Sequence, residues 1–95
     1  MITITVRHKV VDFAKWKSVF DSAQARRREA GEIACRVYTR HGSPNDVTVM
    51  LDWDTLERAQ AFLASAPLMS GMSEAGVREM PQITILERRD EYALV

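Results

Sequence analysis

His8 is the side chain in this sequence best suited to acid–base chemistry. It lies near the end of residues 2–9, an alternating segment in which Ile2, Ile4, Val6 and His8 share one face. A neutral imidazole on the apolar face of a strand can act as a general base or hydrogen-bond a substrate oxygen. The alternative is a structural histidine at a strand end, satisfied by a backbone carbonyl or by water.

The surroundings expected for His8 are apolar. The helix after this strand begins beside His8, and an antiparallel neighbouring strand begins at the same end. The chain then returns there through a second helical region. An apolar pocket with one polar group is typical of small-molecule sites. The residues expected to line this pocket are Phe13, Trp16, Val47, Leu68, Met69, Met72 and Met80. Alternatively, the same residues only fill the core.

The other residues that could take part in chemistry are weaker candidates for a functional site. Trp53 is predicted at the opposite end of the sheet, about 15–20 Å from His8, and is interpreted as a core anchor. Cys35 is the single cysteine, so neither an internal disulfide nor a cysteine-based zinc site can form. His8 and His41 have no carboxylates at metal-ligand spacing. No phosphate loop, dinucleotide fingerprint or catalytic triad motif is present. We therefore expect neither a metal nor a cofactor.

The periodicity that positions these residues predicts four strands and two helical regions. Residues 2–9, 32–40, 47–53 and 81–87 alternate as strands, and residues 41–46 form a turn. Helices are predicted over residues 13–29, from a cap at Asp54 or Thr55 to about residue 64, and briefly after Pro67. This order predicts one ferredoxin-like α+β domain, residues 1–95, with a four-stranded antiparallel sheet and a tail at 88–95.

The two faces of the predicted sheet differ in character. One carries Ile4, Val6, Cys35, Val37, Val49, Leu51, Ile83 and Ile85, and we expect helices to cover it. The other is rich in threonine. It is either an ordinary solvated face or the interface of a homodimer in which two sheets close into an α/β barrel. The interface residues expected are Thr3, Thr5, Arg7, Arg36, Tyr38, Asp52 and Thr84, with Arg36 and Asp52 forming an ion pair.

The composition of the sequence argues against several classes of function. Thirteen basic and thirteen acidic side chains cancel, which argues against nucleic-acid binding. The run Arg26-Arg27-Arg28 falls in the last turns of the first helix, where cations suit the helix dipole. The first ten residues alternate, unlike a signal peptide, and no apolar stretch is long enough for a membrane span. We expect a soluble, cytoplasmic protein.

The segments VRHKVVDFAKWKSVFD and VTVMLDWDTLERAQAFLAS, with the AGV that follows, resemble the dimeric α/β-barrel superfamily. Within it they are most similar to antibiotic-biosynthesis-monooxygenase-like and small polyketide-cyclase-like proteins. The resemblance implies a homodimer of ferredoxin-like subunits with a ligand cavity between sheet and helices. Monooxygenase relatives often carry a histidine in the helix after the third strand, and LERAQAFLAS has none. The only asparagine, Asn45, lies in the predicted turn, which disfavours haem degradation.

These observations leave more than one function open. The first is a cofactor-independent monooxygenase, cyclase or isomerase that acts on a small aromatic or polyketide-like molecule, with His8 as its catalytic residue. The alternative is a non-catalytic small-molecule-binding or assembly module of the same fold. A regulatory effector-binding domain is disfavoured because the chain has no DNA-binding segment.

Overall fold

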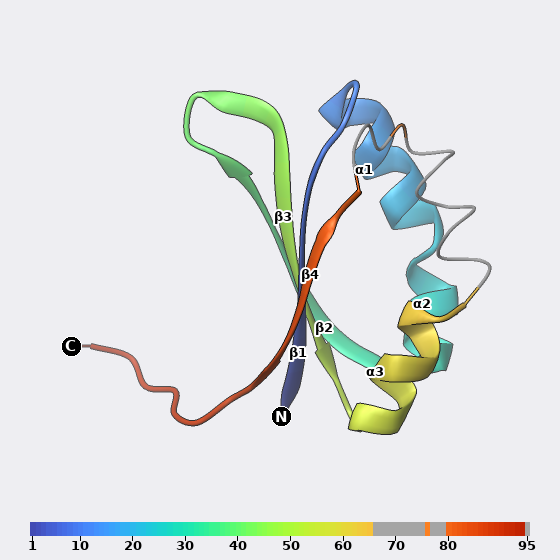
Figure 1. Ribbon diagram of the computed structural model, residues 1–95, viewed down its shortest axis with the longest axis vertical. Helices are drawn as coiled ribbons and strands as arrows, with labels where there is room; N and C mark the ends of the chain where they lie inside the picture. Colours follow the sequence, from blue (N-terminus) through green and yellow to red (C-terminus); the bar gives the residue numbers. More distant parts are fainter. Residues whose placement is uncertain (66–75, 77–79, 95) are drawn as a thin grey trace.

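The computed structural model describes residues 1–65, 76 and 80–94 (Figure 1). Its strands form one antiparallel sheet in the order β2-β3-β1-β4, and the described helices cover one face. This is the predicted ferredoxin-like α+β arrangement. The strands are β1 (Ile2–Lys9), β2 (Glu32–Arg40), β3 (Ser43–Trp53) and β4 (Gln82–Glu87). The helices are α1 (Phe13–Ser22), α2 (Gln24–Ala30) and α3 (Leu56–Leu63).

The central strands β1 and β3 carry most of the core. They pair antiparallel, with Val6 opposite Val49 and Ile2 opposite Trp53. Because side chains alternate along a strand, every second side chain of β1 and β3 faces the helices. The buried apolar core consists of Ile4, Val6, Val10, Trp16, Val47, Val49, Leu51, Trp53 and Ala59.

Side-chain caps start α1 and α3. The Asp12 carboxylate accepts a hydrogen bond from the Lys15 amide (3.0 Å), and of the two candidates for α3 it is Thr55 that caps. The single helix expected over 13–29 is wrong, because the chain breaks at Ala23 into α1 and α2. The Phe20 carbonyl at this break accepts hydrogen bonds from the Ala23 amide and the Arg27 guanidinium.

The hairpin turn is shorter than predicted. It is confined to His41 and Gly42, and β3 already begins at Ser43. The pairing of β2 with β3 shifts between Thr39 and Arg40, so the chain bulges around Pro44. Proline has no amide hydrogen for a sheet ladder and is tolerated at such a bulge.

Fewer side chains on the helix-facing side of the sheet are buried than the sequence predicts. Cys35 is exposed, and Ile83 and Ile85 are 41% and 39% exposed. These positions lie on β2 and β4, the outer strands of the sheet, whereas the described core lies on β1 and β3. Leu56, the first residue of α3, is 37% exposed. The short helix predicted after Pro67 lies outside the described residues.

Gly31 ends α2 and lies against the residues that begin α3. Its φ is +120°, a backbone conformation that L side chains rarely adopt. Its carbonyl accepts a hydrogen bond from the Asp54 amide (3.2 Å). The Arg58 guanidinium, which is paired with the Asp54 carboxylate at 2.7 Å, also donates to the Glu29 carbonyl. A Cβ on Gly31 would lie 2.7 Å from Asp54 Oδ1 and 2.9 Å from Arg58 Nε.

We expect Gly31→Ala to lower the free energy of unfolding by about 1–3 kcal/mol, from backbone strain and from this clash. Gly42→Ala is the matched control. Its φ is also positive, +79°, but nothing lies within 4 Å of the added Cβ. Urea unfolding of both variants measures the difference. Equal losses would mean that the Asp54–Arg58 pair moves aside at no cost.

No helix in the part of the chain that is described is long and apolar enough to cross a membrane.

Candidate functional site

His8 occupies the position on β1 that the alternation predicts. It lies opposite Val47 in the sheet, its ring faces α1, and it is 6% exposed. Within residues 1–65, 76 and 80–94, neither ring nitrogen has a hydrogen-bond partner. The structural alternative of a histidine held by a backbone carbonyl is therefore not observed there. A buried polar group left unpaired costs about 1–3 kcal/mol, so a hydrogen-bond partner for either nitrogen would stabilise this buried ring.

An aromatic wall on α1 faces His8. Helical spacing puts Phe13, Trp16 and Phe20 on one stripe of α1. The Trp16 ring centre lies 5.6 Å from that of His8. Trp16 also contacts Phe13 at 5.8 Å and stacks on Phe20 at 4.9 Å. The imidazole therefore has a flat, apolar neighbour that is itself buried, with 3% of Trp16 exposed.

Electrostatics keep His8 in its neutral form. Burial lowers the pKa of His8, and the negative charge of Asp46 opposes this shift only in part. The Asp46 carboxylate is bound by the Arg7 guanidinium, with contacts of 2.9 and 3.2 Å. His8 is accordingly able to accept a proton near neutral pH.

Asn45 fixes the connection that follows His8, a role that the sequence analysis missed. Its side-chain oxygen accepts from the Phe13 amide (3.0 Å), and its side-chain nitrogen donates to the Val11 carbonyl (3.3 Å). Its backbone carbonyl accepts from the Val10 amide (2.9 Å). The available signal was an asparagine beside a proline in a loop, where such side chains commonly bind nearby backbone.

The structure brings together only some of the predicted pocket residues. Trp16 and Val47 are buried beside His8, and Phe13 packs on Trp16. Met80 is 91% exposed and does not join them. Gly76 lies near this end of β1, since its carbonyl accepts from the Val11 amide (3.0 Å). Three further predicted residues, Leu68, Met69 and Met72, lie outside the described residues.

Trp53 lies at the far end of the same layer, as predicted. It is fully buried and its ring contacts Phe62 of α3 at 4.9 Å. Six residues of β3 separate it from Val47, about 20 Å along a strand. Its indole N–H has no partner in the described part of the chain, which the sequence could not reveal. Trp53 and His8 are too far apart to touch one small molecule.

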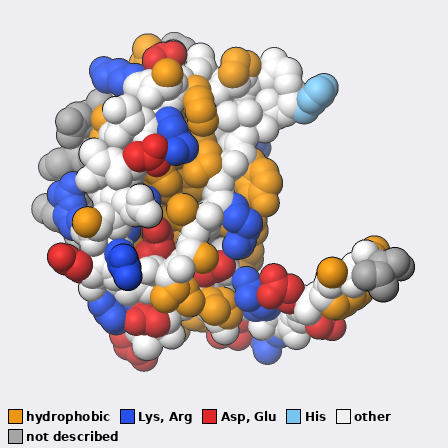
Figure 2. All heavy atoms as spheres, turned by 180° about the vertical axis from the view of Figure 1, so that it is seen from behind, with side chains coloured by type: hydrophobic (Ala, Val, Ile, Leu, Met, Phe, Trp, Pro, Cys, Tyr) orange, Lys and Arg blue, Asp and Glu red, His pale blue; other side chains and the backbone are white. Residues whose placement is uncertain are grey.

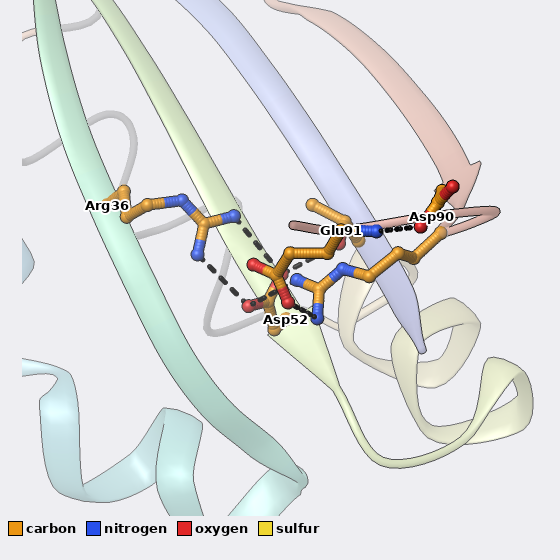
Figure 3. Close-up of polar contacts among 6 residues, drawn as sticks. Arg36, Asp52, Asp90 and Glu91 are labelled. Atoms are coloured by element: carbon orange, nitrogen blue, oxygen red, sulfur yellow. Dashed lines mark hydrogen bonds and ion pairs between the residues drawn. The ribbon is translucent and has the colours of Figure 1, made fainter. Parts of the chain in front are cut away.

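The residues expected at a dimer interface lie on the other sheet face. Thr5 pairs with Met50 and Thr84 in the sheet, and Met50 pairs with Arg36. The predicted ion pair is present, because Arg36 Nη1 lies 3.1 Å from Asp52 Oδ2 (Figure 3). Thr3 also donates to Asp52, at 2.7 Å. Arg7 is exposed on the same face, and Tyr38 is 51% exposed.

Asp52 is the centre of this polar cluster. It is 3% exposed, and Arg88 Nη2 lies 3.5 Å from Oδ2, the oxygen that Arg36 Nη1 also contacts. Burial alone would raise the pKa of Asp52. Hydrogen bonds from Arg36 and Thr3, together with the charges of Arg36 and Arg88, outweigh that effect and leave the pKa below its ordinary value. Asp52 is therefore an ionised, fully paired carboxylate at neutral pH.

The described residues contain no group of three or more histidine, cysteine, aspartate or glutamate side chains placed to hold a metal ion.

Comparison with known proteins extends this description. No protein-family model matches the sequence, and no curated protein matches it. Among solved structures, the chain is similar to SnoaB, a cofactor-independent oxygenase from Streptomyces nogalater, with a TM-score of 0.78 and 16% identity over 95% of this chain and 94% of that one. A structure described as an antibiotic biosynthesis monooxygenase gives a TM-score of 0.73 at 8% identity, over 95% of this chain and all of the other.

The chain has the fold of the antibiotic-biosynthesis-monooxygenase-like proteins. A Nitrosomonas europaea protein of unknown function shares this fold, with a TM-score of 0.73 and 17% identity over 99% of this chain and 94% of that one. Because one fold supports many activities, function has to be argued from the site.

Proposed function

We propose that this protein is a cofactor-independent enzyme that removes a proton from a small aromatic or polyketide-like molecule, with His8 as the general base. The observation that carries the proposal is the buried His8 ring, whose two nitrogens are unpaired within the described residues. Its depressed pKa supports a base that is neutral and ready to accept a proton. The similarity to SnoaB, itself described as a cofactor-independent oxygenase, supports the same class of chemistry.

The expected substrate follows from the walls of the site. Trp16 and Phe13 present aromatic surface beside His8, and Val47 closes the sheet side. A flat, apolar molecule with one acidic C–H or O–H group matches this arrangement. Phenols, and methylene groups between aromatic rings or carbonyl groups, are acidic enough for an imidazole to deprotonate when the resulting anion is delocalised.

Oxygenation, isomerisation and cyclisation can all begin with the removal of one proton from the substrate. His8 takes the proton from an activated CH₂ group, and the electron pair remains on the substrate as a delocalised carbanion. In an oxygenation, the carbanion passes electrons to O₂, a C–O bond forms and the peroxide takes up a proton. Loss of water then removes the second hydrogen and leaves a ketone, so one O₂ yields one product oxygen and one water. In an isomerisation the anion is reprotonated elsewhere, and in a cyclisation it attacks a carbonyl of the same molecule.

Deuterium exchange tests the shared step, whichever reaction follows. A panel of anthrones, naphthols and 1,3-diketones is incubated with the protein in D₂O, and incorporation at the acidic carbon is measured by mass spectrometry. Oxygen uptake is followed in parallel. We expect at least one compound to exchange or consume O₂ faster than in buffer. A compound that binds tightly at His8 without exchange or O₂ uptake would instead support the non-catalytic binding module.

A further inference from the structure

Arg27 of α2 is a buried cation outside the proposed site. The Lys and Arg side chains visible in Figure 2 lie at the surface among acidic and neutral groups, whereas Arg27 is 5% exposed. Its Nε donates to both carboxylate oxygens of Glu32, at 3.1 and 3.2 Å, and Glu32 is 9% exposed. Burying a charge pair costs desolvation, and apolar side chains of similar volume often give equal or greater stability. Stability alone therefore does not explain why this pair is buried.

The guanidinium of Arg27 holds the end of α1 in two ways. Its Nη1 donates to the Phe20 carbonyl in the last turn of α1, and its central carbon lies 3.7 Å from the centre of the Phe20 ring. A planar cation over an aromatic face is attracted by the electrons of the ring. Glu32, at the start of β2, fixes the direction from which the guanidinium approaches. Both the backbone and the ring of Phe20 are thus held by a residue outside α1.

A continuous series of ring contacts leads from Phe20 to His8. The Phe20 and Trp16 rings stack with their centres 4.9 Å apart and their planes 17° apart. The Trp16 ring centre lies 5.6 Å from that of His8, with the planes tilted by 51°. Because a nearly parallel stack fixes the plane of each ring against the other, the orientation of Phe20 sets that of Trp16. Trp16 in turn is the aromatic side chain that contacts the His8 ring.

Trp16 has two aromatic neighbours on α1, and Phe20 makes the closer contact. The Phe13 ring lies 5.8 Å from Trp16 with the planes 32° apart, and the Phe13 amide donates to Asn45. The Phe20 ring is nearer to Trp16 and more nearly parallel to it. A change at Phe20 is therefore expected to move the Trp16 ring more than a change at Phe13 does.

We propose that Arg27 is a positioning residue for His8. The ion pair of Arg27 holds Phe20 in place, and Phe20 holds the Trp16 ring against the imidazole. The consequence for catalysis rests on the proposed function, in which Trp16 bounds the space where the substrate meets His8. Arg27 acts through two rings and has no direct part in the proton transfer.

Removal of the ion pair without loss of the fold tests this role. The double variant Arg27→Met/Glu32→Leu replaces both buried charges by apolar side chains, so the fold is expected to be kept. The readout is the set of ring resonances of His8 and Trp16 in NMR spectra, recorded at a pH where His8 is neutral. A neighbouring aromatic ring shifts such resonances according to its position. We expect both sets to move from their wild-type values, because Trp16 no longer stacks on a fixed Phe20 ring.

Lys17→Met/Asp21→Leu is the matched control for this double variant. It makes the same kind of replacement in the Lys17–Asp21 pair of α1, whose side chains are 40% and 54% exposed. We expect the control to keep the wild-type ring resonances of His8 and Trp16. If the folded Arg27→Met/Glu32→Leu variant moved these resonances no further than the control does, the proposal would be overturned.

Kinetics separate this inference from the proposed function. With a compound of the panel that turns over, we expect Arg27→Met/Glu32→Leu to raise KM about two- to tenfold, the size of one lost aromatic contact, and to change kcat less. An unchanged KM would overturn the role of Arg27 in catalysis even if His8 is the base. If His8→Ala retained wild-type turnover, the proposed function would fail, whereas the resonance test of Arg27 would still apply.

Two further measurements do not depend on how the double variant folds. Phe20→Leu removes only the ring between Arg27 and Trp16, and we expect it to shift the His8 ring resonances as well. In the wild-type chain we expect nuclear Overhauser contacts between the Arg27 side chain and the Phe20 ring, and between the Phe20 and Trp16 rings. Wild-type His8 resonances in a folded Phe20→Leu variant, or the absence of either contact from the wild-type chain, would overturn the proposal.

Discussion

Replacement of His8 by alanine is expected to lower turnover at least about a hundredfold, the usual contribution of a general base. The effect should fall mainly on kcat, because the aromatic side chains proposed to hold the substrate are unchanged. Stopped-flow or deuterium-exchange rates with the best compound of the panel measure it. His8→Gln provides a second variant. It retains hydrogen bonding but cannot accept the proton, so we expect a loss of similar size.

His41→Ala is the matched control for the His8 variants. His41 is the only other histidine, and it lies exposed in the turn between β2 and β3. We expect its variant to retain wild-type rates. If His8→Ala turned over at the wild-type rate while remaining folded, the proton would be removed by another group and the assignment of His8 would fail.

Glu32→Gln is expected to lower the free energy of unfolding by about 3–5 kcal/mol, the typical result of breaking a buried ion pair. Arg27 Nε lies 3.1 Å from Glu32 Oε1, and both side chains are less than a tenth exposed. Burial raises the pKa of Glu32, and the charge and hydrogen bonds of Arg27 offset this only in part. The variant leaves the Arg27 charge buried with no counter-charge. Urea unfolding monitored by tryptophan fluorescence measures the loss.

Two comparisons make the Glu32 prediction specific. Asp21→Asn breaks the exposed Lys17–Asp21 pair at 2.6 Å, and we expect it to cost no more than about 0.5 kcal/mol. The double variant Arg27→Met/Glu32→Leu removes both buried charges and is expected to recover much of the stability that Glu32→Gln loses. A loss for Glu32→Gln no larger than that for Asp21→Asn would mean that water reaches the pair.

Alternation in the sequence was enough to predict the sheet and the placement of His8. The helix-facing position of His8, the burial of Trp53 and the shared face of Arg36 and Asp52 follow from side chains that point alternately to opposite faces. The bulge near Pro44 was not predicted, because it depends on contacts distant in sequence. Asn45 leaves the ladder with β2 and binds the chain between β1 and α1.

Burial at the sheet edges and pairing inside the core could not be predicted from periodicity. Cys35 and Ile85 have the same pattern as buried residues, but they lie on outer strands of the sheet. Of the run Arg26-Arg27-Arg28, Arg27 and Arg28 lie in the last turn of α2, but the pattern did not identify Arg27 as the buried member. That role comes from Glu32, which accepts its hydrogen bonds, and from the Phe20 ring, 3.7 Å below its guanidinium.

The imidazole nitrogens of His8 give the most direct test of the proposed function, in which a neutral base with no hydrogen-bond partner among the described residues binds a ligand under α1. Two-dimensional ¹H–¹⁵N spectra of the side chain, assigned with the His41→Ala variant, follow its protonation with pH and with a bound naphthol. We predict that His8 titrates below the ordinary histidine value of about 6.5 and that the naphthol shifts its nitrogen resonances. A ring that is charged at neutral pH, or that does not respond to any bound compound of the panel, would contradict the claim.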